Sequence, residues 1–582
     1  MFFAALQIVL GTMEEDSVYE RVRSMLRTFK RLIFVAMLLQ SVSLCRAREY
    51  PYRWVFVSRS LQADKDVTDI ERIVRTASEH GLNGMVLSAG LDQLDLQSPG
   101  YLQRLQRVKG ICGEYHVDII PCIFSAGYGG SVLAHNRNLA AGIPVNDVPL
   151  LVDGGRASLA PDRAVALANP GFEEYDGNRV KGYGFHDRPG EVSFVDTQVF
   201  RTGRASLRFE NFGRYEHGHG RVMQEVEVQP HRCYRLTCWV RTESLEAAGS
   251  FRVLVLGPND RDLAPYDPQV PSTTDWRPVV MGFNSLDYDR VRVYAGVWGG
   301  KTGRFWLDDL AIEEVALLNV LRRPGTPVTV RSDDASQVYE EGRDFAAVED
   351  ERLNFRFDHE PPALKILPGS HIKDGQRLRV SYYHGMSVYD GQVSVCMSDP
   401  QVYEIWGQQA RLMVKHLGTS KYLLSMDEIR AGGGCQACKQ RNLTLAQILG
   451  DCVTQQVNIL RQADPNAEVF IWSDMLDPNQ NAHDHYYLVE GDFTGSWKYI
   501  PKDLIIVCWY YEKRSESLGF FSSHGFRTLA GAYYDGDTLE NPRAWLEVLN
   551  RTPKAVGIMY TTWQDKYELL SPFGDLIAGK GN

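Results

Sequence analysis

The sequence predicts an α/β protein, a (β/α)8 (TIM) barrel that an all-β jelly roll or sandwich and a small β-rich segment interrupt after its third strand. Three observations predict it. Buried strand patterns alternate with helix patterns near both ends of the chain, which is typical of a parallel sheet. Between these two parts, amphipathic strands follow one another without helices, which is typical of a sandwich. The strands outside the middle part number eight, as a closed barrel requires.

Length and composition describe an ordinary globular protein. The 582 residues allow three or four domains of about 150 residues each. Hydrophobic residues make up 44% of the chain and charged residues 23%, which supplies enough apolar mass for large cores. The net charge of −10 gives no reason to expect a nucleic acid or an anionic membrane surface as a partner.

Residues 1–47 are interpreted as a leader that contains a secretory signal. A basic segment that begins at Met25 precedes the apolar run 32–44 and a small-x-small cleavage site that ends at Ala47. Translation is therefore expected to start at Met25, and the mature protein is expected to be secreted or periplasmic. The apolar run is too short for a membrane span. Cys45 leaves lipidation open as an alternative.

Residues 48–167 are expected to form the first part of the barrel. Each predicted strand is a short apolar run that ends in small or polar residues, and each is followed by a helix pattern. The strands are expected at 54–57, 84–87 and 117–124, with helices at 67–80 and 101–115 between them.

Residues 168–315 are expected to form the sandwich. The marks are Asn169-Pro-Gly-Phe-Glu173 at its start, Thr274-Asp-Trp276 in its middle and Trp306-Leu-Asp-Asp-Leu310 at its end. The stretch resembles the jelly-roll carbohydrate-binding modules of xylanases and related enzymes. A spacer or a calcium-stabilised structural domain is the alternative. Residues 316–385 are expected to form a small β-rich segment between the sandwich and the barrel.

Residues 386–582 are expected to complete the barrel with five strands. The first of them begins at Lys421 and ends at Asp427-Glu428, just before three glycines at 432–434. Neighbouring strand residues point to opposite faces, so the two acids share a pocket only if the chain turns there. The alternative is a helix N-terminus, where acids complement the helix dipole. The remaining strands are expected to begin near 468, 504, 528 and 555.

Aromatic and acidic residues gather at the predicted C-terminal strand ends, where (β/α)8 barrels carry their active sites. Aromatic rings stack on the apolar faces of sugars, and carboxylates accept hydrogen bonds from sugar hydroxyls. This combination indicates a carbohydrate substrate. The candidate residues are Arg59, Tyr128, Asp427, Glu428, Trp472, Asp474, Trp509, Tyr510, Tyr533, Tyr534, Asp535 and Trp563.

The order of these residues forms a motif. It runs Asp427-Glu428, Trp472-Ser-Asp474, Trp509, Tyr533-Tyr-Asp535 and Trp563, after the approach Cys396-Met-Ser-Asp-Pro-Gln-Val-Tyr403. It resembles the catalytic barrel of glycoside hydrolase family 20, the β-N-acetylhexosaminidases, over 50–150 and 386–575. The resemblance implies a retaining exo-β-N-acetylhexosaminidase, and the leader implies that it is exported. In such enzymes the 2-acetamido oxygen of the substrate attacks the anomeric carbon, which is substrate-assisted catalysis.

The resemblance also implies a role for each residue. Glu428 would be the general acid and then the base, with a pKa raised by burial. Asp427 would orient the acetamido N–H, and Tyr533 would donate a hydrogen bond to the acetamido oxygen. The substrate-binding residues would be Trp472, Trp509 and Trp563 as walls, Asp535 on a distal hydroxyl, and Arg59, Tyr128, Asp474 and Tyr510 beside them.

The sequence departs from the family pattern before the acids. Leu423, Ser425 and Met426 stand where the family places a His or Asn and two glycines, and Arg59 is the candidate for an arginine that grips sugar hydroxyls. The chain is therefore expected to be a divergent relative with an altered sugar subsite.

Two other functions stay open. One is a glycosidase of the same fold for a sugar without an acetamido group, with Asp474 or Asp535 as nucleophile. The other is a non-catalytic glycan-binding protein. The expected partner is a glycan or oligosaccharide with a terminal amino sugar, and the sandwich could either bind a polysaccharide or shape the pocket.

No metal or cofactor is expected from the sequence. Cys435-Gln-Ala-Cys438 lacks a second pair or a histidine partner, so it is a weak zinc signal. A local disulfide, or a bridge to Cys452, explains the pair equally well. His483 and His485 are expected to face solvent or substrate.

Overall fold

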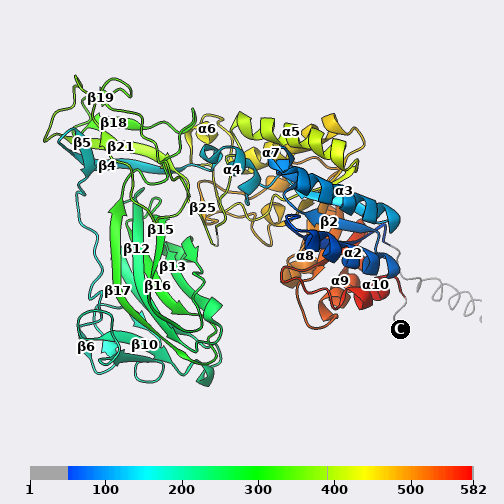
Figure 1. Cartoon of the computed structure of the whole chain (residues 1–582), viewed down its shortest axis with the longest axis horizontal. Coiled ribbons are helices and arrows are strands. Elements are labelled where there is room, and N and C mark those ends of the chain that lie inside the picture. The colour runs from blue at the N-terminus through cyan, green and yellow to red at the C-terminus, as the bar shows by residue number, and fades with distance from the viewer. Residues whose placement is uncertain (1–49, 390, 580–582) are drawn as a thin grey trace, which may run out of the picture.

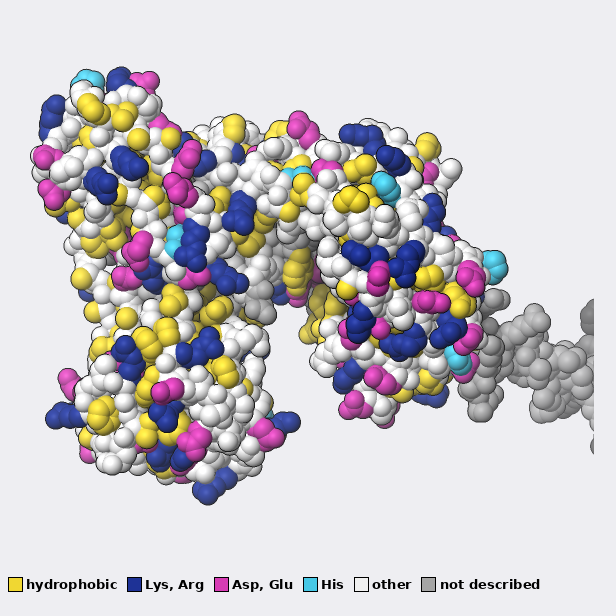
Figure 2. All heavy atoms as spheres, in the orientation of Figure 1, with side chains coloured by type: hydrophobic (Ala, Val, Ile, Leu, Met, Phe, Trp, Pro, Cys, Tyr) yellow, Lys and Arg dark blue, Asp and Glu magenta, His cyan; other side chains and the backbone are white. Residues whose placement is uncertain are grey.

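The computed structural model describes residues 50–389 and 391–579, so the expected leader and its export signal lie outside the described residues. Figure 1 shows three β structures: a barrel surrounded by helices on the right, a sandwich at the lower left, and a smaller sheet above the sandwich. Figure 2 shows a notch between the sandwich and the barrel on this face. Within the described ranges, no helix is both long and apolar enough to cross a membrane.

The barrel is a closed sheet of eight parallel strands. The third barrel strand, β3 (Asp118–Ile123), pairs directly with the fourth, β22 (Lys421–Leu424), although β22 lies about 300 residues later in the chain. The last two strands, β27 (Arg527–Tyr533) and β28 (Ala555–Thr561), also pair with each other. The strands are β1 (Tyr52–Ser58), β2 (Gly84–Ser88), β3 (Asp118–Ile123), β22 (Lys421–Leu424), β24 (Glu468–Trp472), β26 (Ile505–Cys508), β27 (Arg527–Tyr533) and β28 (Ala555–Thr561).

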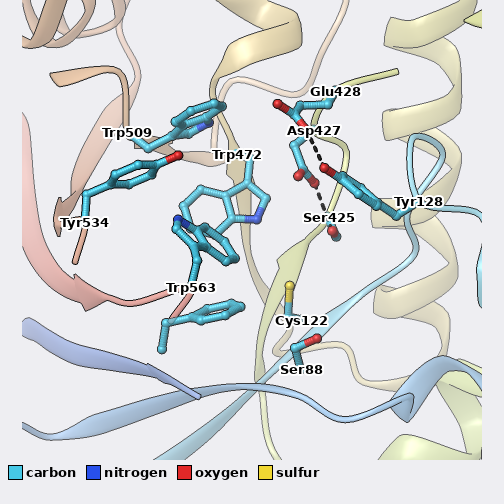
Figure 3. Close-up of a pocket in the computed structure, with 11 residues that line it drawn as sticks. Ser88, Cys122, Tyr128, Ser425, Asp427, Glu428, Trp472, Trp509, Tyr534 and Trp563 are labelled. Atoms are coloured by element: carbon cyan, nitrogen blue, oxygen red, sulfur yellow. Dashed lines mark hydrogen bonds between the residues drawn. The ribbon is translucent and has the colours of Figure 1, made fainter. Parts of the chain in front are cut away.

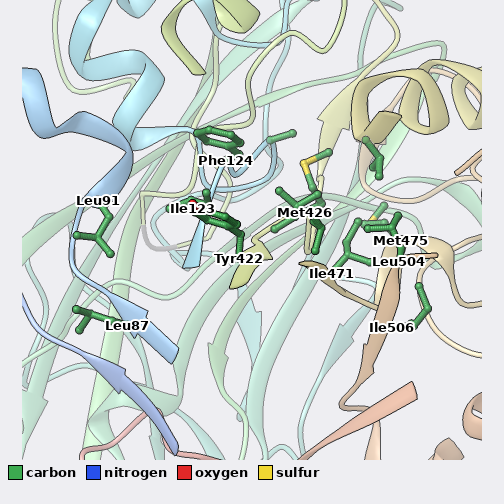
Figure 4. Close-up of a cluster of buried hydrophobic side chains, with 14 of the residues drawn as sticks. Leu87, Leu91, Ile123, Phe124, Tyr422, Met426, Ile471, Met475, Leu504 and Ile506 are labelled. Atoms are coloured by element: carbon green, nitrogen blue, oxygen red, sulfur yellow. The ribbon is translucent and has the colours of Figure 1, made fainter. Parts of the chain in front are cut away.

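Both faces of the barrel strands are buried, which is why their sequences are nearly continuous apolar runs. The inward side chains form a small cluster that includes Trp54, Phe470 and Leu529. The outward side chains pack against the helices, and Figure 4 shows part of this second cluster, with Leu87, Ile123, Tyr422 and Ile471. The helices are α2 (Asp64–Glu79), α3 (Pro99–Glu114), α4 (Gly130–His135), α5 (Pro400–His416), α6 (Gln436–Lys439), α7 (Leu445–Ala463), α8 (Arg514–Ser523), α9 (Glu540–Arg551) and α10 (Leu570–Ile577).

Two helices begin at caps that their sequences provide. Asp399 accepts a hydrogen bond from the Gln401 N–H at the start of α5, with Pro400 at the first helical position. Thr444 and Gln447 form a capping box at the start of α7. Both helices flank β22, the strand that leads to the acids, so their fixed starts help to fix its surroundings.

The sandwich consists of two five-stranded antiparallel sheets whose facing side chains form one core. One sheet has the order β15 (Thr274–Asn284), β12 (Cys233–Glu243), β17 (Arg304–Val315), β10 (Ser206–Glu210) and β9 (Ser193–Asp196). The other has the order β14 (Asp262–Tyr266), β13 (Phe251–Leu256), β16 (Arg290–Val297), β11 (Gly220–Glu227) and β8 (Phe185–His186). A separate hairpin pairs β6 (Tyr175–Asp176) with β7 (Arg179–Val180).

The smaller sheet differs from the expectation. We expected residues 48–167 to belong to the barrel, but β4 and β5 pair with β21 in a six-stranded sheet. An unpaired strand edge leaves backbone groups without hydrogen-bond partners, and β4 pairs with one edge of β21 while β18 pairs with the other. The order is β19 (Val338–Tyr339), β18 (Thr329–Ser332), β21 (Arg377–His384), β4 (Ile143–Asp153), β5 (Arg156–Leu159) and β20 (Leu364–Lys365).

Candidate active site

A cavity of about 500 Å³ opens at the C-terminal ends of the barrel strands. Figure 3 shows that it has an acidic wall and an aromatic wall that face each other. Its lining brings together seven of the residues that the sequence singles out, from six strand ends, because every barrel strand points the same way. The lining residues are Phe56, Ser88, Cys122, Tyr128, Ser425, Asp427, Glu428, Trp472, Trp509, Tyr534 and Trp563.

The two acids share this cavity because the chain leaves the strand geometry at Glu428. Ser425 and Asp427 point inward and Met426 outward, as alternation requires. Glu428 has a φ of 48°, which breaks the alternation and brings its side chain to the same side as Asp427. The turn therefore lies at Glu428 itself and not at the glycines that follow.

A close backbone contact supports this turn. A Cβ atom on Gly127 would lie 2.0 Å from the carbonyl oxygen of Asp427 and 2.9 Å from that of Glu428, so only glycine fits. The Gln392 side-chain amide donates to the carbonyl oxygens of Gly127, at 3.1 Å, and Glu428, at 2.7 Å. Gln392 thus ties the acid turn to the loop after β3.

The Glu428 carboxylate is paired with positive charge. Arg430 Nη2 lies 2.8 Å from its Oε2, and the Tyr128 hydroxyl donates to the same oxygen. The Arg430 guanidinium in turn lies over the rings of Tyr389 and Tyr487, at 4.5 and 5.1 Å from their centroids. These contacts occupy Oε2 and leave Oε1 as the oxygen that can face a substrate.

Asp427 is the more weakly acidic member of the pair. Burial raises its pKa to about 6, and the nearby charge of Glu428 acts in the same direction. Ser425 opposes this by donating a hydrogen bond to Asp427 Oδ1 at 2.9 Å. Asp427 therefore keeps its proton to a higher pH than an ordinary aspartate does.

Asp474 supports the turn at Glu428 through hydrogen bonds and does not line the cavity. It is fully buried, and its Oδ2 accepts hydrogen bonds from the Glu428 N–H at 2.8 Å and from Asn481 at 2.9 Å. Burial raises its pKa to about 8, with the charge of Asp427 as the next cause. The expected substrate-binding residue is therefore a positioning residue.

The aromatic wall comes from the last four strands. Trp472 and Trp563 have ring centroids 6.5 Å apart, and Tyr534 lies 6.4 Å from Trp563 in an edge-on arrangement. Trp563 is 53% exposed and Tyr534 is 52% exposed, so both rings are free to stack on a ligand. Trp509 completes the wall, as Figure 3 shows.

Tyr533 does not lie in the cavity, which corrects its expected role. Ala532 already points outward, and the φ of 85° at Tyr533 keeps the next side chain on the outer side as well. Its ring is buried and stacks on Tyr560 at 4.0 Å. Tyr534 takes the place in the cavity that the sequence motif assigned to Tyr533.

Three further predicted residues lie outside the lining. Asp535 accepts hydrogen bonds from the Trp563 N–H at 2.9 Å and the Gln564 N–H at 3.3 Å, so it holds the loop that carries Trp563. Arg59 pairs with Asp565 at 2.6 Å in the same region. Tyr510 follows β26, where it precedes a short turn, and does not contribute to the cavity surface.

Several residues of the site were missed in the sequence. Ser425 lies two residues before Asp427, so strand alternation alone could have placed it inside the cavity. Phe56 and Cys122 also lie at inward positions of predicted strands. Arg430 lies only two residues after Glu428, but their ion pair depends on how the chain turns at Glu428, which no sequence pattern indicates. Gln392 follows from no local pattern, because its contact with Glu428 joins segments 36 residues apart.

The chain was compared with protein families, curated proteins and solved structures. No family model and no curated protein matches it. Among solved structures it is similar to the rhamnosidase from Novosphingobium sp. PP1Y, with 10% identity over 91% of this chain and 59% of that one and a TM-score of 0.32. It is also similar to TmCBM61 in complex with beta-1,4-galactotriose, with 19% identity, 25% of this chain, 95% of that chain and a TM-score of 0.19. A structure described as CBM4 shares 13% identity over 26% of this chain and 99% of that one, with a TM-score of 0.19. These TM-scores are too low to support an argument about function.

Proposed function

We propose that this chain is a glycoside hydrolase that releases terminal β-linked N-acetylhexosamine residues by substrate-assisted catalysis. The observation that carries the proposal is the division of the cavity into two walls. Asp427 and Glu428 are adjacent and lie on one wall, while the facing wall consists of Trp472, Trp509, Tyr534 and Trp563. A sugar that stacks on the aromatic wall would meet both acids with its other side.

This division favours a nucleophile from the substrate. A retaining glycosidase with its own nucleophile places two carboxyl groups about 5 Å apart on opposite sides of the scissile bond. Here both carboxyls that line the cavity come from one turn, and Asp474 and Asp535 lie outside the lining. The acetamido oxygen would attack the anomeric carbon as the glycosidic C–O bond breaks and Glu428 protonates the leaving oxygen. Water would then open the cyclic intermediate, with Glu428 accepting its proton.

The protonation of the acid pair fits these roles. The pKa of Asp427, raised to about 6, lets the pair retain one proton in mildly acidic solution. When the acetamido N–H docks on Asp427 it would favour the Asp427 carboxylate and shift the proton to Glu428 Oε1. Because Tyr533 is buried behind the strand, we assign the hydrogen bond to the acetamido oxygen to Tyr534.

A second candidate is a glycosidase for a sugar without an acetamido group. It is favoured by the contacts of Arg430 and Tyr128 with Glu428, which hold its carboxyl group in a fixed position, as a nucleophile requires. Asp427, with its raised pKa, would then be the acid. In this alternative Glu428 replaces Asp474 and Asp535 as the nucleophile, because neither of those reaches the cavity.

Release of 4-nitrophenol from paired aryl β-glycosides, N-acetylated and plain, tests the proposal. We expect turnover only of the acetamido sugars, and a loss of kcat of about 10²-fold or more in Glu428→Gln and Asp427→Asn. Turnover of the plain sugars alone would support the second candidate. Binding without any turnover, measured on a glycan array, would contradict both and indicate a glycan-binding protein. Export of the mature chain stays part of this proposal and is tested by the location of the full-length product.

A further inference from the structure

Three buried cysteine thiols meet at one point, where the loop that follows the acid turn reaches the segment before α5. The Sγ atom of Cys435 lies 3.5 Å from that of Cys396 and 3.6 Å from that of Cys438, and the third distance is 3.9 Å. The three residues are between 1% and 5% exposed. Cys396 lies 39 residues before Cys435 in the chain, so the cluster joins two separate segments.

These distances are those of ligands around one metal ion. A tetrahedral zinc ion with Zn–S bonds of about 2.3 Å separates its sulfur ligands by about 3.8 Å. A disulfide requires about 2.05 Å between the two sulfur atoms, which none of the three pairs approaches. Pairwise distances that nearly match one another also favour a common centre over a single bond between two of the thiols.

We propose that Cys396, Cys435 and Cys438 form a structural zinc site. The cluster is too deeply buried to admit a substrate, which is typical of a structural site and not of a catalytic one. The Ser398 hydroxyl, two residues after Cys396, is buried and has no hydrogen-bond partner among the described residues, so this oxygen or a water molecule can complete the coordination.

The surroundings of the cluster suit its charge. Three thiolates and one Zn²⁺ carry a net negative charge, which needs a positive neighbour when buried. Arg323 is 4% exposed at its side chain, and its Nη2 lies 3.8 Å from Cys435 Sγ. Hydrogen bonds of 2.8 and 3.0 Å to the carbonyl oxygens of Asn138 and Ala140 hold the guanidinium there.

The backbone holds two of the ligands in place before any metal binds. The Cys396 N–H donates to the Leu139 carbonyl oxygen at 2.9 Å. The Cys438 N–H donates to the Cys435 carbonyl oxygen at 3.1 Å, which closes the turn between these two ligands. Such a fixed arrangement lowers the entropy lost when a metal is bound.

A zinc ion here would brace the acid turn. Gln392, which donates to the Glu428 carbonyl oxygen, belongs to the segment that carries Cys396. Arg430, which pairs with Glu428, belongs to the loop that carries Cys435. Zinc would join these two segments a few residues from both contacts, so its loss should loosen the position of Glu428.

Metal analysis of the full chain tests the site without reference to activity. After reconstitution with zinc and removal of free metal, we expect about one zinc per chain, as a structural site holds one ion. Cys396→Ser, Cys435→Ser and Cys438→Ser should each lose at least about tenfold in zinc affinity. Cys112→Ser is the matched control, because Cys112 and Cys396 are both 2% exposed, and it should keep its zinc.

A second measurement needs no variant. Cobalt added to the metal-free wild type should give thiolate-to-cobalt charge-transfer bands that zinc abolishes. Absence of these bands would overturn the proposal even if the serine variants fail to fold. The protein should also be purified without reductant. If two of the three cysteines then form a disulfide and the protein cannot take up zinc, the proposal is overturned as well. Zinc binding without glycosidase activity would contradict only the proposed function, and glycosidase activity without zinc binding would contradict only the zinc site. The two proposals are therefore tested separately.

Discussion

At the residue scale, the site depends on positions where the chain leaves the regular alternation of a strand. The φ of 48° at Glu428 turns a second acid into the cavity, and the φ of 85° at Tyr533 keeps its ring out of it. Alternation could be read from the sequence and placed Asp427 correctly. The positive φ values at Glu428 and Tyr533 could not be predicted from the sequence, because neither residue type indicates a left-handed conformation.

Asp474 provides a prediction at this scale. A free aspartate loses its proton near pH 4, but burial raises the pKa of Asp474 to about 8. Between these values the folded state holds a proton that the unfolded state has lost, so stability decreases as pH rises, by up to about 1.4 kcal/mol per pH unit. Asp474→Asn removes this titration and should be more stable than the wild type above pH 8.

The amide suits the geometry of that position. Its oxygen can accept the hydrogen bonds of the Glu428 N–H and Asn481, and its NH₂ group would replace Oδ1, which has no hydrogen-bond partner among the described residues. The measurement is Tm from pH 5 to pH 9 for both proteins. Asp427 titrates in both proteins, so the difference between the two curves reports the titration of Asp474 together with its interaction with Asp427. Parallel curves would contradict the raised pKa.

At the scale of elements, the barrel strands were the most predictable feature. All eight lie where the apolar runs are, because a strand buried on both faces needs a continuous apolar sequence. The pairing of β4 and β5 with β21 was not predictable, since their alternating patterns fit any half-buried sheet. The contact between the β3 loop and the acid turn was equally hidden, because it joins residues 127 and 427.

Gly127→Ala tests that contact between elements. The added Cβ would meet two carbonyl oxygens, which cannot move without displacing the acid turn. We expect kcat/KM to fall by about 10²-fold, the effect of misplacing a catalytic group by roughly 1 Å. Gly110→Ala is the control, because a Cβ there meets no atom within 4 Å and lies inside α3, where alanine should stabilise by about 0.5–1 kcal/mol. Equal activity of both variants would contradict the proposed fit.

At the scale of the whole molecule, the sandwich reaches the neighbourhood of the site. Arg261 of the sandwich donates to the carbonyl oxygens of Tyr487, at 2.6 Å, and Val489, at 2.7 Å, in a barrel loop. Tyr487 lies against Arg430, which pairs with Glu428. The sequence left open whether the sandwich tethers the enzyme or shapes the pocket. These contacts favour a role in shaping, and they could not be foreseen because they join residues more than 200 apart.

Arg261→Ala measures this role. Loss of both hydrogen bonds should free the loop that supports Arg430, so kcat/KM on small aryl glycosides should fall by roughly tenfold. Arg290→Ala is the matched control, because Arg290 is an exposed sandwich residue that pairs with Glu225 on the same surface. If Arg261→Ala impairs only polymeric substrates, the sandwich acts as a tether.

The central claim is that the substrate supplies its own nucleophile in the barrel cavity. The most direct test is kcat/KM for aryl 2-acetamido-2-deoxy-β-glycosides that carry none, one, two or three fluorine atoms on the acetyl group. Each fluorine withdraws electrons from the attacking oxygen. We therefore expect kcat/KM to fall stepwise, by more than about tenfold across the series, which corresponds to more than about 1.4 kcal/mol in the barrier. A flat series, or an enzyme that ignores the acetamido group, would contradict it.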